Sequence, residues 1–255
     1  MNAQPAKDGV QGRIAAGLSA LGVRRGGLLL VHASLSSLGW VPGGAPAVIE
    51  ALRLTLGPEG TLLLPALTYE YVDHRQPVFD QARTPSCVGA ISECFRTMPG
   101  IQRSLAPTHS VCGSGPEASW ILGRHHLDNT PCGPRSPFRA VRDLHGAILF
   151  LGCGLRPNTS VHGIEELVEP PYLFGGPVRY RMITGHGGRL DVTVRRHAFD
   201  GFIQRYDRVL EALPEHGWRS GRVGQAMAYL LDARILWDRA GMMLRRDPYA
   251  LVERG

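Results

Sequence analysis

The sequence predicts an α/β fold in which helices flank a mixed central sheet, with a C-terminal hairpin and helices packed on that sheet. Short, uninterrupted apolar runs at residues 27–32, 60–64 and 147–151 are typical of strands that are buried on both faces. Segments with apolar residues at helical spacing alternate with these runs, as α/β proteins require. Beyond Pro170, two strand-like segments flank Gly185-His186-Gly187-Gly188, which is a hairpin signature.

The first 170 residues carry most of the helix and strand signals. Helices are expected over four segments, each ended by glycine or proline: 9–21, 45–56, 88–98 and 117–123. Residues 65–85 have no clear period and are expected to form a long functional loop. A further helix is expected over 159–167, after the third apolar run and a glycine turn.

The remaining residues continue the same domain. The hairpin strands are expected at 178–184 and 189–194, followed by helices at 199–213 and 223–240. We therefore expect one domain over residues 1–255. Its α/β part, with most of the site loops, spans 1–170, and the hairpin and C-terminal helices span 171–255.

Composition excludes several classes of protein. With 44% hydrophobic and 20% charged residues, the chain is not of the disordered class. No apolar run approaches the roughly 18 residues of a membrane span, and residues 1–27 hold no signal-peptide pattern. The five cysteines are odd in number and never spaced as CxxC, which favours a reducing, cytoplasmic location. The net charge of +6 comes from scattered arginines with 7% aromatics, so neither a nucleic-acid partner nor a membrane partner is expected.

A metal site is not expected. The adjacent pair His125-His126 sends its side chains in different directions on a strand or a helix. No HExxH motif or other ligand pair at useful spacing occurs in the chain.

The segment from Asn158 to Glu166 is the sharpest candidate for chemistry. It follows a buried strand and a glycine turn, where open α/β sheets place ligands. On a helix, His162 and Glu165 are three residues apart and project from one face. A carboxylate beside an imidazole fixes its tautomer and stabilises the imidazolium, as a general base for acyl transfer to an amine requires. An ordinary surface His–Glu pair is the alternative interpretation of this spacing.

Two further segments are weaker candidates. Around His109 and Ser110 a nucleophilic serine is conceivable, but the chain lacks the Gly-x-Ser-x-Gly elbow of α/β-hydrolases. The hydroxyl-rich turn from Ser34 to Gly39 follows a strand, and its backbone N–H groups could hold phosphates. It matches neither a Walker A motif nor Gly-x-Gly-x-x-Gly, and a simple capped turn is the alternative.

Ordered motifs over about residues 12–250 resemble the aminoglycoside 3-N-acetyltransferase family. They include LLLVHASLSSLGWVPGG, GTLLLPALTYEY, RSLAPTHSV, ILFLGCGLRPNTSVHGIEE and GRVGQAMAYLLDARIL. The resemblance implies an acetyl-CoA-dependent N-acetyltransferase whose fold is distinct from that of the common N-acetyltransferase superfamily. It also implies acetyl-CoA as co-substrate, with no metal.

The resemblance assigns roles to individual residues. The family's Thr-x-x-His-x-x-Glu pattern falls on Thr159, His162 and Glu165, which implies His162 as base and Glu165 as the group that orients it. The positions implied for the coenzyme A site are Ser34, Leu35, Ser36, Gly39, Ser104 and Ser110. The family's Arg-Ser-x-His-Pro-x-x-Ser pattern begins at Arg103, and its histidine is Ala106 in this chain.

An amino-sugar acceptor, first of all an aminoglycoside, is the leading expectation. A polycationic acceptor attracts carboxylates, and Tyr69, Asp73 and Glu166 are the expected substrate-binding residues. Backbone N–H groups or the hydroxyls of Thr68 or Ser110 are candidates for stabilising the oxyanion.

Other functions remain open at this point. The alternatives are an acetyltransferase for a biosynthetic amino sugar or a nucleotide-linked amine, a non-catalytic relative that kept the scaffold, and an acyl-CoA hydrolase. The intact His162–Glu165 pair favours an enzyme, and the missing nucleophile elbow counts against the hydrolase.

Overall fold

The computed structural model describes residues 9–255 and is built on a seven-stranded mixed sheet with strand order β10-β11-β6-β1-β2-β5-β4. Its centre consists of the three predicted apolar runs, now seen as β1 (Leu28–Ala33), β2 (Thr61–Pro65) and β6 (Ala147–Leu151). These three strands are parallel, whereas β11 and β5 run antiparallel to their neighbours β6 and β2. The mixed sheet and the α/β class predicted from the sequence are confirmed.

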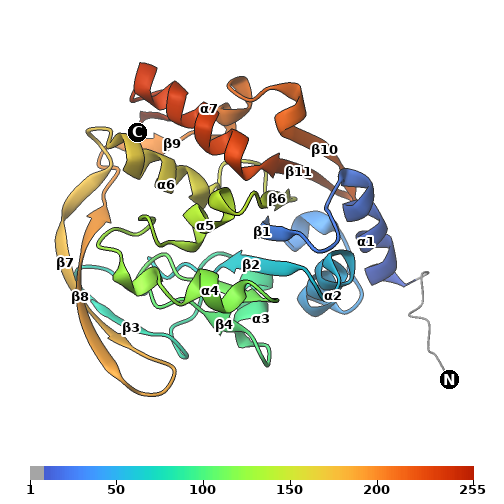
Figure 1. Ribbon diagram of the computed structural model, residues 1–255, viewed down its shortest axis with the longest axis horizontal. Helices are drawn as coiled ribbons and strands as arrows, with labels where there is room; N and C mark the ends of the chain where they lie inside the picture. The colour runs from blue at the N-terminus through green and yellow to red at the C-terminus, as the bar shows by residue number, and fades with distance from the viewer. Residues whose placement is uncertain (1–8) are drawn as a thin grey trace.

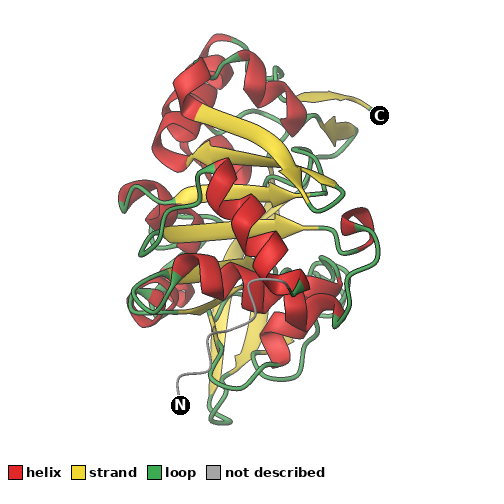
Figure 2. Cartoon of the chain, turned by 90° about the vertical axis from the view of Figure 1, so that its right-hand side faces the viewer, coloured by secondary structure: helices red, strands yellow, loops and turns green. Residues whose placement is uncertain are grey.

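Helices cover both faces of the sheet (Figure 2). The helices are α1 (Val10–Leu21), α2 (Gly44–Leu56), α3 (Ala90–Thr97), α4 (Ala118–Leu122), α5 (Pro137–Asp143), α6 (Thr159–Val168) and α7 (Ala233–Arg246). The other strands of the main sheet are β4 (Gln102–Arg103), β5 (Val111–Ser114), β10 (Trp218–Val223) and β11 (Ala226–Asp232). Among residues 9–255, no helix is both long and apolar enough to cross a membrane.

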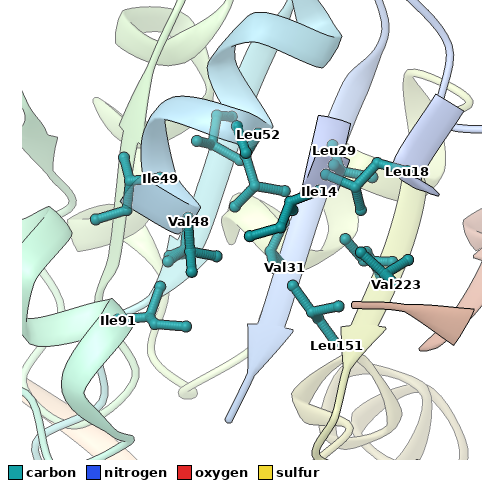
Figure 3. Close-up of a cluster of buried hydrophobic side chains, with 14 of the residues drawn as sticks. Ile14, Leu18, Leu29, Val31, Val48, Ile49, Leu52, Ile91, Leu151 and Val223 are labelled. Atoms are coloured by element: carbon teal, nitrogen blue, oxygen red, sulfur yellow. The ribbon is translucent and has the colours of Figure 1, made fainter. Parts of the chain in front are cut away.

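Strand β1 shows why the central runs are apolar throughout. Leu29 and Val31 pack into the core beside α1 and α2, whereas Leu30 points to the opposite core beside α6 and α7. Figure 3 shows the first of these cores, in which Leu29 and Val31 meet Ile14 and Val48. Because successive side chains of a strand alternate between faces, a strand covered on both sides must be apolar at every position.

Two small sheets stand beside the main one. The predicted hairpin forms β7 (Phe174–Ile183) and β8 (Arg189–His197), and β3 (Val78–Asp80) pairs with β7. Figure 1 shows this long hairpin at one end of the molecule, with β3 beside it. The second sheet pairs β9 (Phe202–Gln204) with β12 (Val252–Arg254). Residues 65–85 are thus not entirely irregular, because they contain β3.

The helix predicted over 199–213 is wrong. The backbone turns sharply at Phe199 (φ 51°) and Gly201 (φ 77°), then forms β9 and a 3₁₀ helix at Tyr206–Glu211. A right-handed helix requires negative φ at every residue. The two positive values therefore exclude an α-helix at the start of this segment, although its apolar residues have helical spacing.

The prediction of a helix over 223–240 is wrong for its first part and confirmed only from residue 233. Residues 226–232 form β11, which pairs with the buried strand β6 through partners such as Leu230 and Leu149. Helix α7 begins only at Ala233, where the Asp232 side chain accepts a hydrogen bond from the Ile235 backbone N–H. Because β10 and β11 join the sheet built by the first 170 residues, the segments 1–170 and 171–255 share one sheet. Residues 1–8, part of the segment in which no signal peptide was expected, lie outside the described residues.

Candidate active site

A cavity of about 580 Å³ lies where the three parallel strands end. His32 and Ala33 come from the end of β1, Leu67 and Tyr69 follow β2, and the loop and helix α6 after β6 supply most of another wall. The wall residues used below are His32, Tyr69, His109, Arg156, Asn158, Thr159, His162, His197, Phe199 and Tyr206. Such an edge is where open α/β sheets bind ligands, because the loops after parallel strands meet there.

His162 and Glu165 project from α6 toward one another, as the sequence predicts. The His162 Nδ1 lies 3.3 Å from the Glu165 carboxylate, which is fully buried. Gly163 lets α6 approach α7 closely, since a Cβ at that position would lie 2.5 Å from the Trp237 ring. The histidine side chain keeps 15% of its surface exposed, so it belongs to the cavity wall while its partner lies behind it.

Two tyrosines hold the buried Glu165 carboxylate. The Tyr172 hydroxyl donates to Oε1 and the Tyr206 hydroxyl donates to Oε2, both at 2.8 Å. The Tyr206 oxygen also lies 2.9 Å from the His162 Nδ1. A buried carboxylate needs such donors, because burial without hydrogen bonds is costly. These partners leave the His162 Nε2 as the nitrogen available to a ligand.

His162 is surrounded by two further histidines, which sequence reasoning did not bring together with it. The ring centroids of His109 and His197 lie 5.5 and 5.1 Å from that of His162, and 5.2 Å from one another. Burial, reinforced by the charge of neighbouring histidines, holds the pKa of His109 and of His197 well below the usual value. Both rings are therefore neutral at pH 7, and His162 is the most exposed of the three.

His32 and Asn158 lie within motifs singled out from the sequence, but the sequence assigns neither of them a role of its own. Burial, followed by the charge of His162, lowers the pKa of His32 to about 3, and its ring stacks on Phe150 at 5.0 Å. The side-chain amide of Asn158 is buried and has no hydrogen-bond partner among the described residues. Local pattern does not reveal their burial in the cavity wall, because that burial depends on segments distant in the chain.

The sequence as a whole matches a known family of enzymes. A sequence profile described as Aminoglycoside 3-N-acetyltransferase matches residues 30–245. The chain belongs to the aminoglycoside 3-N-acetyltransferase family. The resemblance seen in the sequence is thereby confirmed, as is membership of an acyltransferase family.

Relatives of this chain cover nearly all of it. It is 35% identical to aminoglycoside N(3)-acetyltransferase IV from Salmonella over 232 residues, which make up 89% of this chain and 84% of the relative. Its fold resembles that of AAC-IIIb in a binary complex with CoASH, with a TM-score of 0.81, 28% identity and coverage of 93% and 96%. It also resembles a mutant of AAC(3)-IVa in complex with a gentamicin, with a TM-score of 0.80, 30% identity and coverage of 98% and 92%.

Four of the positions implied for coenzyme A surround a second cavity of about 580 Å³. This cavity is lined by Ser34, Leu35, Ser36 and Gly39, and it shares Ala33 with the first cavity. The Ser34 hydroxyl is 3.2 Å from that of Ser36 and accepts a hydrogen bond from Ser37 at 3.0 Å. Gly39 has a φ of 75°, and a Cβ there would lie 2.5 Å from the Gln225 side chain. The turn from Ser34 to Gly39 therefore requires glycine at its last position.

The other two positions implied for coenzyme A, Ser104 and Ser110, line neither cavity, and their assignment to the cofactor site stays a prediction. The Ser110 hydroxyl donates to the Ala66 carbonyl at 2.6 Å and accepts from Arg103 at 3.0 Å. The Ser104 hydroxyl pairs with His125 at 3.0 Å and accepts from the Val111 backbone N–H at 2.9 Å. Both side chains are fully occupied in joining buried segments, which also removes Ser110 as an oxyanion donor.

The third hydroxyl considered for the oxyanion is also engaged elsewhere. Thr68 is fully buried, and its hydroxyl donates to the Pro107 carbonyl. Ala106, where the family pattern has histidine, is buried and lines only a small internal void with His109.

The three expected acceptor-binding residues have different positions. Tyr69 is half-exposed and lines the first cavity. Asp73 does not line it, and its carboxylate accepts two backbone N–H groups of its own loop at 2.7 Å. Glu166 is turned away from the cavity and accepts hydrogen bonds from Thr130 at 2.6 Å and from the Cys132 backbone at 2.8 Å. Neither Asp73 nor Glu166 lines this cavity, and their role in binding an acceptor stays a prediction.

The described residues offer no cluster of metal ligands at this site. Within residues 9–255, no group of three or more His, Cys, Asp or Glu side chains could hold a metal ion. The three neighbouring histidines instead have hydrogen-bonding partners or lie edge to face.

Proposed function

We propose that this protein is an acetyl-CoA-dependent N-acetyltransferase that acetylates an amino sugar, with the 3-amino group of an aminoglycoside as acceptor. The observation that carries the proposal is the arrangement of His162. Its Nδ1 is backed by Glu165 and Tyr206, while its Nε2 remains available in the wall of a cavity that adjoins the serine-lined one.

The geometry supports general base catalysis by His162. As the amine nitrogen attacks the thioester carbonyl and the C–N bond forms, His162 Nε2 removes a proton from that nitrogen. Glu165 stabilises the resulting imidazolium at Nδ1. When the C–S bond breaks, the imidazolium returns the proton to the leaving thiolate, so the products are the amide and free coenzyme A. Proton transfer of this kind contributes about 10²–10⁴ in rate.

The remaining surroundings fit the two substrates. The cavity lined by Ser34 and Ser36 would hold coenzyme A, and the cavity around His162 and Tyr69 would receive the acceptor. The proposal includes a cytoplasmic location, which the five unpaired cysteines support.

One observation favours a second acceptor class, a less cationic amine such as a biosynthetic amino sugar or a nucleotide-linked amine. Among the described residues that line the His162 cavity, none is Asp or Glu, whereas Arg156 is present. The nearby carboxylates of Glu165 and Glu166 already have two or more hydrogen-bonding partners each. A polycation would then have to find its carboxylates outside this cavity.

Thiol release from acetyl-CoA, measured against a panel of amines, tests the proposal. The panel holds aminoglycosides, simple amino sugars and nucleotide-linked amino sugars, and mass spectrometry follows the transferred acetyl group. Release that requires an aminoglycoside and acetylates its 3-amino group supports the first acceptor class. Release only with weakly charged or anionic amines supports the second. Release without any amine indicates a hydrolase, and no release at all with any amine overturns the transferase assignment.

A further inference from the structure

A second histidine–carboxylate pair lies beside the His162–Glu165 pair and is not used in the mechanism above. Glu166 is next in the chain to Glu165, and its Oε1 lies at hydrogen-bonding distance, 2.8 Å, from the Nε2 of His197. His197 is the last residue of β8, so this pair joins α6 to the hairpin. Both side chains are nearly inaccessible, with exposures of 5% and 6%.

Glu166 is held in a way that fixes the tautomer of His197. Its carboxylate accepts from the Thr130 hydroxyl and from the Cys132 backbone N–H, and the Nε2 of His197 is its third partner. The low pKa of His197, caused mainly by burial, keeps its ring neutral. A neutral imidazole has one N–H. Burial raises the pKa of Glu166 to about 7, so above that pH its carboxylate accepts the N–H at Nε2, and Nδ1 is left as an acceptor.

That acceptor has no partner. The Nδ1 of His197 is buried and makes no hydrogen bond to any described residue, although His197 lines the cavity. A buried polar atom without a partner is costly and rare unless something binds there. The ring lies 5.1 Å from His162, so one nitrogen atom about 3 Å from each ring could contact both.

We propose that His197 is a second contact to the reacting amine, its Nδ1 accepting one N–H while His162 removes the proton of the other. This inference rests on the proposed N-acetyltransferase function. A primary amine has two N–H bonds besides its lone pair, so the two imidazoles would aim the lone pair at the thioester. Glu166 is then a positioning residue, which acts by holding the tautomer of His197.

The proposal predicts different results for two amide substitutions at the same position. In His197→Gln the amide reaches the place of Nε2 and can still bond Glu166, but nothing replaces Nδ1. In His197→Asn the shorter amide reaches the place of Nδ1. We expect His197→Gln to lower kcat/KM for the amine about tenfold, the effect of one lost hydrogen bond to a substrate, and His197→Asn to retain more activity. The KM for acetyl-CoA should stay unchanged in both, and His186→Asn, in the exposed hairpin turn, is the matched control.

A secondary amine gives a sharper comparison. An N-methylated acceptor has only one N–H, so it cannot contact both rings, and wild type should prefer the primary amine. That preference should shrink in His197→Gln. Two results would overturn the proposal. One is an equal preference for the primary amine in wild type and in His197→Gln. The other is a kcat/KM of His197→Gln for the primary amine within twofold of the wild-type value.

The tautomer itself can be measured without any turnover. The ¹⁵N chemical shifts of the His197 ring at pH 8 should show a neutral imidazole protonated at Nε2. The same tautomer is expected in Glu166→Gln, because the amide oxygen can accept a hydrogen bond as the carboxylate does. In Glu166→Ala we expect a mixture of the two neutral tautomers. A ring protonated at Nδ1 in wild type would overturn the inference. Failure of every amine in the assay while this tautomer is present would instead count against the proposed function.

Discussion

Tyr206 and His162 are separated by 44 positions in the chain, yet the tyrosine oxygen lies 2.9 Å from the imidazole Nδ1. The same hydroxyl donates to Glu165 at 2.8 Å. The 3₁₀ helix that carries Tyr206 thus completes a hydrogen-bonded unit begun on α6. Tyr172 donates to Oε1 of the same carboxylate, whereas His162 contacts Oε2. The two tyrosines therefore form a matched pair for experiment.

Removing the Tyr206 hydroxyl should impair the base more than removing that of Tyr172. Each phenylalanine variant takes one donor from a buried carboxylate, which costs about 1–3 kcal/mol of stability. Only Tyr206→Phe also changes the contact to His162, so its kcat should fall about tenfold further than that of Tyr172→Phe. Steady-state kinetics and thermal unfolding of both variants check this, and equal losses of kcat would contradict it.

Removing the imidazole of His162 should abolish most of the activity. His162→Ala is expected to lower kcat/KM by about 10²–10⁴, the range for loss of a general base. The fold should survive, because the side chain is partly exposed in a cavity wall. Circular dichroism and thiol release are the measurements, with His186→Ala as control. Activity within a few-fold of wild type would remove His162 from the catalytic role.

A bulky residue in the serine-lined cavity should block coenzyme A. Ser36→Trp is expected to weaken acetyl-CoA binding at least tenfold by calorimetry, because the indole would fill space that the cofactor needs. The KM for the amine should not change. Ser119→Trp, on the exposed face of α4, is the control. Unchanged acetyl-CoA affinity in Ser36→Trp would exclude this turn from the cofactor site.

Ser110, expected from the sequence to touch coenzyme A, should behave as a structural residue. Ser110→Ala removes a donor from the Ala66 carbonyl and an acceptor from Arg103, both buried. A loss of about 1–3 kcal/mol of unfolding free energy is expected, with acetyl-CoA affinity unchanged. Denaturant unfolding and calorimetry test this. A large loss of affinity without loss of stability would restore Ser110 to the cofactor site.

Stability should fall as the pH drops from 6.5 toward 5. Four buried histidines have a pKa below the usual value of 6.5: His32, His109, His125 and His197. In this range the unfolded chain binds protons at these rings that the folded chain does not, so acid favours unfolding. Burial raises the pKa of Asp128 to about 6 and of Glu166 to about 7, and these two groups act in the opposite direction.

The four histidines outnumber the two acids, so the net slope is at most about 3 kcal/mol per pH unit. Denaturant unfolding at a series of pH values measures it. The slope should decrease in His125→Gln, whose amide can still donate to the Pro131 carbonyl. Stability that stays constant or rises between pH 6.5 and 5 would contradict the assignment of neutral buried rings.

The elements that local pattern determines were predicted well. Strands β1, β2 and β6 are apolar at every position because both faces are covered, and α6 brings His162 and Glu165 together by helical spacing alone. The hydroxyl-rich turn after β1 also lies where the sequence places it, at a strand end beside a cavity. In each case the residues of the element itself carry the pattern, so the sequence predicts the element without knowledge of its distant neighbours.

Segments whose apolar spacing fits either a helix or a strand were decided by distant partners. Residues 226–232 become β11 because the edge of β6 is free to pair with them, and an isolated sequence segment does not show that edge. Distant partners also determine what the hydroxyls of Ser104 and Ser110 do. Ser104 pairs with His125 and Ser110 donates to the Ala66 carbonyl, and no local pattern predicts either contact.

The sequence by itself determined the α/β class, the family and the pair His162–Glu165. Only the tertiary structure decided that Tyr206 and His197 join that pair and that Glu166 does not face the cavity. The physical reason is range: a helix fixes contacts three or four residues apart, whereas these contacts connect α6 with chain segments more than thirty residues away. They form only when the hairpin and the C-terminal segment pack against α6, and no local pattern of residue types specifies that packing.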